Sequence, residues 1–246
     1  MDLETYKVQK LIANAGFCSR RRAEELIEQK RVTLNGKIAK PGDRATPNCR
    51  IEIDRKPLNI KQNKKIYLIL NKPVGFVSTM HDERNRKTAA DLIKHKANTR
   101  VFIVGRLDLN SEGLMLFTND GELAQQIMHP SHHITKTYEV KINKILQQVE
   151  IEKLRQGVFI DGKKTAPAKI TTLCSFAHSN EQLLRFELHE GKKRQIRRML
   201  ACFDAEVIML KRTKIGPLQL GCLKPKVCRH LTASELTALK RAARLN

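Results

Sequence analysis

The sequence predicts an α+β protein in which a small N-terminal domain precedes a larger domain whose mixed, largely antiparallel sheet is flanked by helices. Apolar residues recur at helical spacing in some stretches and alternate with polar residues in others, yet no regular strand–helix repeat runs along the chain. A polar, basic run at 61–65 lacks apolar residues and interrupts these patterns. We therefore expect domains at 1–60 and 66–246, joined by a linker at 61–65.

Composition narrows the range of partners. Lysine and arginine total 47 against 25 acidic residues, and the net charge of +22 favours an extended anionic partner, either nucleic acid or an anionic membrane. No apolar run approaches the roughly 18 residues of a membrane span, and no secretory signal pattern is present. A cytoplasmic protein without a membrane partner is therefore expected. The six cysteines are scattered without a C-x-x-C pair, which predicts neither a zinc site nor disulfides.

Two helices are predicted at the start of the N-terminal domain. Apolar spacing predicts a first helix over 8–15, which Gly16 ends, and Ser19 can cap a second. Three arginines, 20–22, occupy the first turn of the second helix, where cations oppose the helix dipole at a cost of roughly 0.3–1 kcal/mol each. Phosphates docking at the helix start would explain them. The alternative is a solvated charge run that the two following glutamates partly neutralise.

The same domain continues with a hairpin around Asn35-Gly36 and a strand at 51–53. The pattern S-R-R-x-A-E-x-L-I, followed by V-x-L-N-G-K, resembles the alpha-L RNA-binding fold, a module named after a small-subunit ribosomal protein. In that family the helix start and the hairpin grip RNA. The resemblance therefore implies RNA contacts by Arg20, Arg21, Arg22, Lys30, Arg31, Asn35 and Lys37.

Strands and helices of the larger domain follow from alternation, helical spacing and caps. Strands are expected at 66–70, 100–104, 114–118, 135–142, 158–160, 168–174, 183–189 and 205–210. Helices are expected from a cap at Thr88, over 123–128 before Pro130, over 145–155, and from the capping box Thr232-x-x-Glu235. A histidine cluster at 129–133 lacks cysteines or carboxylates at ligand spacing, so no metal site is predicted there.

One carboxylate stands out in the stretch 104–121. Gly105 breaks a short strand, and Arg106-Leu107-Asp108-Leu109 follows. Period-two alternation would place Arg106 and Asp108 on one face and the two leucines on the other. A local ion pair on a surface turn is the simpler interpretation of an isolated R-x-D pattern.

Two further segments carry residues of interest. Tyr138 lies in the alternating strand TKTYEVKI, where a plain core role is the alternative. The segment 190–200 predicts a helix that starts with the cations 192–194, again against its dipole. Ile196 falls on its apolar face and Arg197 at the border, where an arginine can lay its stem on the core and pair with a carboxylate.

The segments GRLDLNSEGL, KTYEV and GKKRQIRRM, with the Lys72-Pro73 turn, together resemble the pseudouridine synthases, specifically the RsuA-like branch that modifies ribosomal RNA, over about 65–215. The resemblance implies that Asp108 is the catalytic carboxylate, which attacks the ribose C1′, attacks the base, or takes a sugar proton. Tyr138 would stack on the base and help move the C5 proton, while Arg197 would favour the ionised Asp108. The implied substrate contacts are Arg106, at the space or phosphate of a flipped-out base, Ile196 and Lys72.

We therefore expect an isomerase that converts a specific uridine of ribosomal RNA to pseudouridine, acting on RNA or a pre-ribosomal particle as a monomer, with no metal or cofactor. The run K-L-I-A-x-A-G-x-x-S-R-R resembles the large-subunit enzymes more than the small-subunit one, which favours the large-subunit RNA, and the small-subunit RNA is the alternative. A noncatalytic ribosome-assembly factor would share the charge but would not need Asp108, Tyr138 and Arg197. A methyltransferase should show a glycine-rich turn after a strand, which this sequence lacks.

Overall fold

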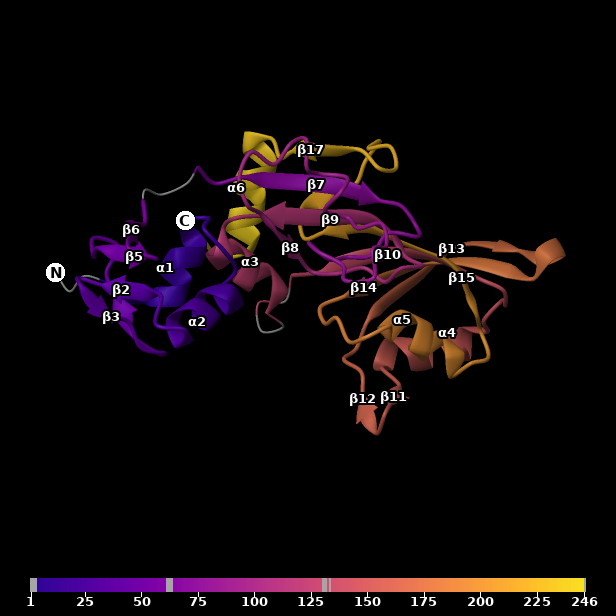
Figure 1. Ribbon diagram of the computed structural model, residues 1–246. Coiled ribbons are helices and arrows are strands. Elements are labelled where there is room, and N and C mark those ends of the chain that lie inside the picture. Colours follow the sequence, from indigo (N-terminus) through magenta and orange to yellow (C-terminus); the bar gives the residue numbers. More distant parts are fainter. Residues whose placement is uncertain (1–3, 61–63, 130–131, 133, 246) are drawn as a thin grey trace. The chain divides into compact units, whose positions relative to one another are not determined.

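The computed structural model describes residues 4–60, 64–129, 132 and 134–245. The chain divides into two compact units, Met1–Lys65 and Ile66–Asn246, which are treated separately (Figure 1). Three residues of the expected linker, 61–63, lie outside the described residues, as does Pro130, the predicted end of a helix. In the described part of the chain, no helix is long and apolar enough to cross a membrane.

The N-terminal unit packs two helices against a small antiparallel sheet. Its helices are α1 (Val8–Asn14) and α2 (Arg20–Glu28), and its strands pair in the order β3 (Lys37–Ile38), β2 (Val32–Leu34), β5 (Ile51–Ile53) and β6 (Lys56–Pro57). A separate pair joins β1 (Tyr6–Lys7) to β4 (Arg44–Ala45). The predicted cap is present, because the Ser19 hydroxyl accepts a hydrogen bond from the Arg22 amide at 3.0 Å. Asn35 and Gly36 both have positive φ, as their hairpin turn requires.

A single mixed sheet organises the larger unit. Its strands follow the order β13-β14-β10-β15-β9-β7-β17, with β16 on β15 and β8 on β9. Every pairing is antiparallel except that of β15 with β9, in agreement with the largely antiparallel sheet expected. The strand bounds are β7 (Tyr67–Lys72), β8 (Phe102–Val104), β9 (Glu112–Thr118), β10 (Lys136–Ile142), β13 (Lys169–Phe176), β14 (Glu181–Leu188), β15 (Val207–Ile215), β16 (Leu218–Gln219) and β17 (Cys228–His230).

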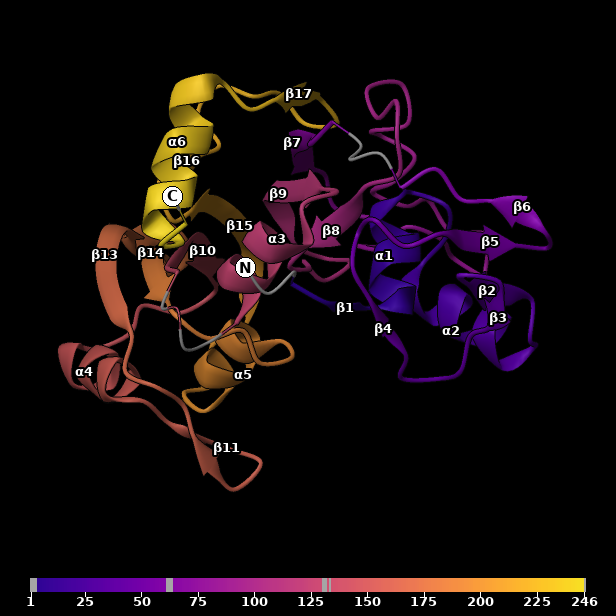
Figure 2. The ribbon, with the colours of Figure 1, turned by 90° about the vertical axis from the view of Figure 1, so that its left-hand side faces the viewer.

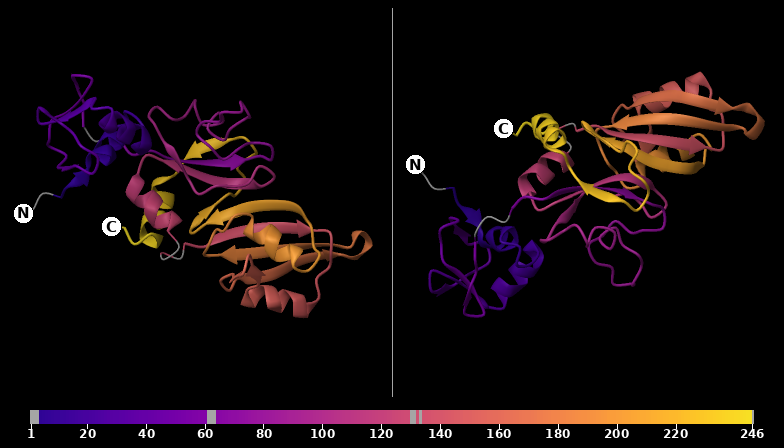
Figure 3. Two further views of the ribbon diagram at one scale, coloured as in Figure 1. Left: turned by 60° about the horizontal axis from the view of Figure 1, so that its bottom comes forward. Right: turned by 90° about the horizontal axis from the view of Figure 1, so that it is seen from above.

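Helices cover different regions of this sheet. α3 (Gly121–Met128) and α6 (Ala233–Ala242) lie together against β7 and β9 (Figures 1 and 2). α4 (Gln148–Gln156) and α5 (Gln195–Ala201) lie against β10 and β14 (Figure 3). A hairpin of β11 (Phe159–Ile160) and β12 (Lys163–Lys164) and the short 3-10 helix η2 (Ala177–Ser179) complete the unit.

Alternation along the central strands separates two apolar layers. Leu114 and Leu116 of β9 pack with α3 and α6, whereas Met115 and Phe117 pack with the loop segment 89–107. Tyr138 of β10 contacts both this loop layer and the α4–α5 layer. One face of the sheet is therefore covered by two different elements, and Tyr138 lies where they meet.

Three local predictions were wrong. Thr88 exchanges hydrogen bonds with Asp91 as a helix cap would, but residues 89–96 form successive turns, with i→i+3 bonds such as that from the Ile93 amide to Ala90. α5 begins at Gln195, because Arg194 adopts the left-handed conformation with φ 52°. The cations at 192–194 therefore precede the helix, and Arg194 occupies its N-cap position. The strand predicted at 205–210 continues to Ile215, because bonds to β9 and β16 extend it.

Candidate active site

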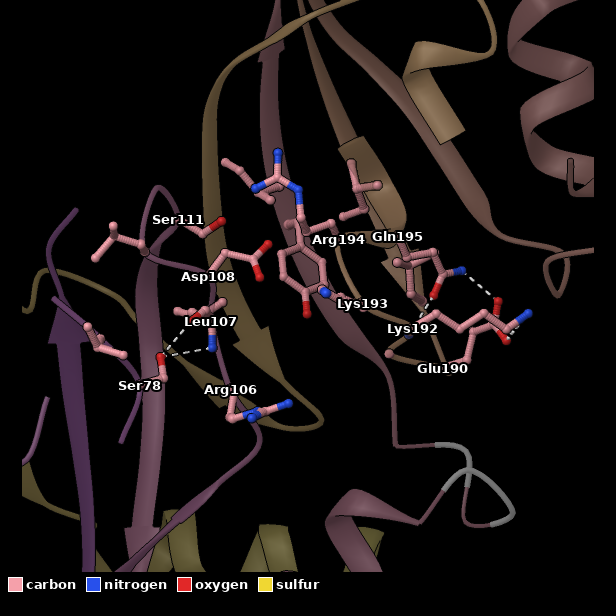
Figure 4. Close-up of a pocket in the computed structure, with 17 residues that line it drawn as sticks. Ser78, Arg106, Leu107, Asp108, Ser111, Glu190, Lys192, Lys193, Arg194 and Gln195 are labelled. Atoms are coloured by element: carbon pink, nitrogen blue, oxygen red, sulfur yellow. Dashed lines mark hydrogen bonds and ion pairs between the residues drawn. The ribbon is translucent and has the colours of Figure 1, made fainter. Parts of the chain in front are cut away.

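A cavity of about 450 Å³ lies on the face of the sheet that is covered by both the loop layer and the α4–α5 layer (Figure 4). Its floor consists of Tyr138 from β10, Leu188 from β14 and Leu210 from β15. One wall comes from the loop layer and the other from the segment that leads into α5. The wall residues are Val77, Ser78, Arg106, Leu107, Asp108, Leu109 and Ser111 on one side, and Glu190, Gly191, Lys192, Lys193, Arg194, Gln195 and Ile196 on the other. The three segments singled out in the sequence thus meet at one cavity.

The backbone on either side of Asp108 is held by a neighbouring loop. The Ser78 hydroxyl donates to the Leu107 carbonyl at 2.6 Å and accepts from the Leu107 amide at 3.1 Å. The Gly75 amide donates to the Leu109 carbonyl at 2.9 Å, in a turn where Gly75 has φ +86°. Because the residues before and after Asp108 are both anchored, its carboxylate is presented to the cavity from a fixed backbone. Ser78 carried no signal in the sequence, since its partner is 29 residues away.

A tight turn continues this wall. The Ser111 amide donates to the Asp108 carbonyl at 3.1 Å. Ser111 is fully buried, its hydroxyl oxygen has no hydrogen-bond partner among the described residues, and it lines the same cavity as Asp108 (Figure 4). The alternation predicted here was half right, because Leu107 is buried but Leu109 is 44% exposed. Residues 105–111 form a loop, in which period two no longer applies.

Other predicted residues reach the cavity from separate elements. Tyr138 pairs across the sheet with Phe186 and Arg212, and it is half-buried. Ile196 is buried in the first turn of α5 and lines the opposite wall. Arg106 lines the cavity and is exposed, so its guanidinium remains available to a ligand. An aromatic ring, an aliphatic side chain, a carboxylate and a cation therefore surround one space.

Arg197 lies beside this space and does not line it. Its Nη2 donates to the Asn110 carbonyl at 2.7 Å and its Nη1 to the Val207 carbonyl at 3.1 Å. Arg197 and Asp108 are not paired among the ion pairs of the described residues, so the predicted contact is absent. These two hydrogen bonds occupy the guanidinium, and the bond to Asn110 ties α5 to the loop two residues beyond Asp108. Burial and the charge of Arg194 lower the pKa of Arg197, and the negative charge of Asp108 acts in the opposite direction.

Lys72 does not occupy the place expected of a substrate contact. Its side chain is fully buried at the end of β7, and its Nζ donates to the carbonyls of Pro73 at 2.8 Å and Phe76 at 3.0 Å. Burial lowers the pKa of Lys72 to about 8, although the nearby charges of Glu112 and Asp108 act in the opposite direction. Lys72 therefore supports the turn that leads to Ser78, outside the cavity lining.

The second wall depends on a carboxylate and an amide that the sequence did not single out. The Gln195 Nε2 donates to the Glu190 Oε1 at 2.6 Å, and the Gln195 Oε1 accepts from the Lys192 amide at 3.1 Å. These bonds close the segment 190–195 on itself. Lys193 and Arg194, expected inside the helix, instead stand in this wall. With Arg106 and Lys192 they outnumber Asp108 and Glu190, so the cavity lining favours an anionic ligand.

All seven predicted RNA-contacting residues of the N-terminal unit are exposed. Glu25 pairs with Arg22 at 2.7 Å and Asp54 pairs with Arg31 at 2.6 Å. Glu25 therefore partly neutralises Arg22, as the alternative interpretation expected. Ion pairs of the described residues do not include Arg20, Arg21, Lys30 or Lys37. The Asn35 side chain is engaged within the unit, where its Oδ1 accepts from the Arg50 amide at 3.0 Å.

Comparison with known proteins agrees with this arrangement. Residues 66–202 match the family described as RNA pseudouridylate synthase, and residues 7–51 match the S4 domain. The ribosomal large subunit pseudouridine synthase B of Bacillus subtilis is 38% identical over 96% of this chain and 96% of its own length. The protein of the same name from Yersinia pestis is 35% identical over 87% of this chain and 68% of its own length. A crystal structure of a pseudouridylate synthase has 29% identity and a TM-score of 0.68, and the match covers 95% of this chain and 99% of that one.

The S4 match lies within the N-terminal unit, and the synthase match includes the Asp108 loop, Tyr138 and α5. No group of His, Cys, Asp or Glu among the described residues is arranged to hold a metal ion. The resemblance expected from the three sequence segments is confirmed. The chain therefore belongs to the RsuA-like RNA pseudouridine synthases, isomerases that convert uridine to pseudouridine in RNA, and it carries an RNA-binding S4 domain before its catalytic domain.

Proposed function

We propose that this enzyme modifies a uridine of large-subunit ribosomal RNA and that Asp108 is its catalytic carboxylate. The observation that carries the proposal is the meeting of Asp108, Tyr138 and Ile196, from segments far apart in the chain, at one cavity of about 450 Å³. A cavity of this size suits a single small ligand, such as one nucleotide. The cations of its lining suit the phosphates on either side of that nucleotide.

Isomerisation breaks the bond from N1 to C1′ and joins C1′ to C5 of the same base. Neither atom can be reached inside a stacked helix, so the target uridine turns out of the RNA into the cavity. The Tyr138 ring stacks on the base from the sheet, and Ile196 contacts it from the opposite wall. Arg106, exposed at the mouth, binds a flanking phosphate or fills the vacated position in the stack.

Asp108 is the carboxylate beside the reacting atoms. It serves by attacking C1′, by attacking the base, or by taking a sugar proton, and each route requires an ionised carboxylate in a fixed orientation. The anchors at Leu107 and Leu109 supply the orientation. Arg197 supports the same loop from the other side, because its Nη2 donates to the Asn110 carbonyl two residues beyond Asp108. Tyr138 helps to transfer to water the proton that leaves C5 once C1′ is attached, and N1, released from C1′, gains a proton from water.

Large-subunit RNA is the proposed substrate because both named relatives above are large-subunit pseudouridine synthases, and the relative from Bacillus subtilis is similar along nearly its whole length. The exposed cations Arg20 and Arg21 of the S4 domain would hold RNA outside the target nucleotide. The sequence run that favoured the large subunit lies in the same domain.

The test measures release of tritium from C5 of uridine in unmodified large- and small-subunit RNA, each as a transcript and as a ribosomal subunit. Wild type and Asp108→Asn are compared, with Asp204→Asn as a control at an exposed aspartate that does not line the cavity. We expect release of tritium from large-subunit RNA only, and only by wild type and Asp204→Asn. Substantial release by Asp108→Asn would remove that residue from the chemistry, and release from small-subunit RNA alone would correct the substrate. Binding without release from any substrate would favour an assembly factor.

A further inference from the structure

We propose that the β11–β12 hairpin extends the cavity wall into an RNA-binding surface, on which Phe159 stacks against an unpaired base next to the target uridine. The inference rests on the proposed function, because it assumes that a flipped-out uridine occupies the cavity. It adds a binding residue that lies outside the cavity lining and outside the S4 domain.

Phe159 is the most exposed large apolar side chain among the described residues, at 69%. It stands in the two-residue strand β11, directly opposite Lys164 of β12, while Ile160 is opposite Lys163. Ile160 packs on the α4–α5 layer, so the two faces of the hairpin differ. Phe159 and Lys164 share the face that has no core to cover.

A tight turn and hydrogen bonds at its base define the shape of the hairpin. Asp161 and Gly162 both have positive φ, which gives the tight two-residue turn of a hairpin. At its base the Thr165 amide donates to the Val158 carbonyl at 2.9 Å, and the Val158 amide donates to the Thr165 hydroxyl at 3.0 Å. The exposed ring of Phe159 is therefore carried on an ordered element.

Several contacts fasten the hairpin to the second wall of the cavity. The Lys192 Nζ donates to the Lys164 carbonyl at 3.3 Å, and the Ala166 amide donates to the Glu190 Oε1 at 3.0 Å. Asp161 at the turn forms an ion pair with Arg198 of α5. Because Lys192 and Glu190 both line the cavity, RNA that leaves the cavity over this wall meets the hairpin next.

The chemistry of this surface fits RNA. Lys163 and Lys164 are exposed and belong to none of the ion pairs of the described residues, and the adjoining wall carries Lys193 and Arg194. Cations beside an exposed aromatic ring bind phosphates and unpaired bases, which stack on the ring whatever their identity. A base that loses its stacking neighbour when the uridine flips out is the base that gains most from such a ring.

The experiment compares Phe159→Ala with Phe159→Trp, which keeps a stacking ring, and with Phe176→Ala, an exposed phenylalanine outside the cavity lining. Steady-state turnover is measured on a hairpin RNA that contains the target uridine. Phe159→Ala should raise KM by about 5- to 50-fold with kcat nearly unchanged. Phe159→Trp and Phe176→Ala should stay near wild type, as should the melting temperature of each variant.

Stacking is then observed directly with 2-aminopurine placed on either side of the target uridine. The probe RNA is bound to Asp108→Asn protein, with and without Phe159→Ala, so that the readout does not depend on turnover. Quenching at one flanking position that Phe159→Ala abolishes would support the inference even if Asp108 were not catalytic. Unchanged quenching and an unchanged KM would overturn it. A defect confined to whole ribosomal particles, with naked RNA bound normally, would also overturn it and assign the ring to a protein partner.

Discussion

Replacing Ser78 by alanine tests whether the loop beneath Asp108 positions the catalytic carboxylate. Ser78 is 8% exposed, and its hydroxyl bonds both the amide and the carbonyl of Leu107. Removing it leaves two buried backbone groups without a partner, each at a cost of about 1–3 kcal/mol. We expect the free energy of unfolding to fall by about 2–6 kcal/mol, because the penalties of the two unpaired groups add.

The effect on activity should exceed the effect on stability. Freed on one side, the loop lets the Asp108 carboxylate move by about 1 Å, which typically costs about 100-fold in rate. The assay measures turnover well below the melting temperature, so that every variant is folded, together with urea unfolding. Thr79→Val is the matched control, because the neighbouring Thr79 hydroxyl donates to the carbonyl of His81 at 2.6 Å and accepts from its amide at 3.3 Å, and His81 is exposed. A Ser78→Ala enzyme with wild-type stability and wild-type turnover would refute the positioning role. Ser78→Thr, which keeps the hydroxyl, should retain most of the stability and most of the turnover.

Two further predictions concern the half-buried Arg197 and the buried Lys72. Arg197→Met keeps the packing of the stem but removes the donors to the Asn110 and Val207 carbonyls. Turnover should therefore fall by about 100-fold, and the free energy of unfolding by about 1–3 kcal/mol. A variant that matches wild type in turnover and urea unfolding would show that Arg197 does not support the Asp108 loop. Lys72 has a pKa lowered to about 8, so the unfolded chain binds more protons than the folded one between about pH 8 and 10. The free energy of unfolding of wild type should therefore rise over that range by up to about 3 kcal/mol relative to Lys72→Met. The free energies of unfolding of both proteins are measured with urea at each pH. The same pH dependence in both proteins would contradict the lowered pKa of Lys72.

Local features followed from the sequence because they depend on neighbours in the chain. The Ser19 cap, the turn at Asn35-Gly36 and the capping box of Thr232 with Glu235 are formed as expected. The alternation around Tyr138 predicted a strand that the structure contains, with Val140 and Ile142 buried. The resemblance carried by three segments also predicted the family correctly.

Predictions failed where tertiary contacts outweighed local preference. The cap at Thr88 is present, but the following residues turn because the Ala89 amide bonds Val77 in another segment. Arg197 was expected to pair with Asp108, yet two carbonyls of other elements satisfy its guanidinium. Lys72 was expected at the substrate, yet the turn after β7 folds over it and buries it.

By itself the sequence determined the order of the domains, most of the strands and helices, the anionic nature of the partner and the identity of the family. Only the tertiary structure decided which side chains share the cavity, how Ser78 holds the Asp108 loop and where the hairpin of Phe159 stands. The reason is physical. Caps, turns and apolar periods are set by residues within a few positions of one another, whereas the bonds that shape this site join residues 29 and 87 positions apart. Such contacts form only once the sheet has brought their elements together.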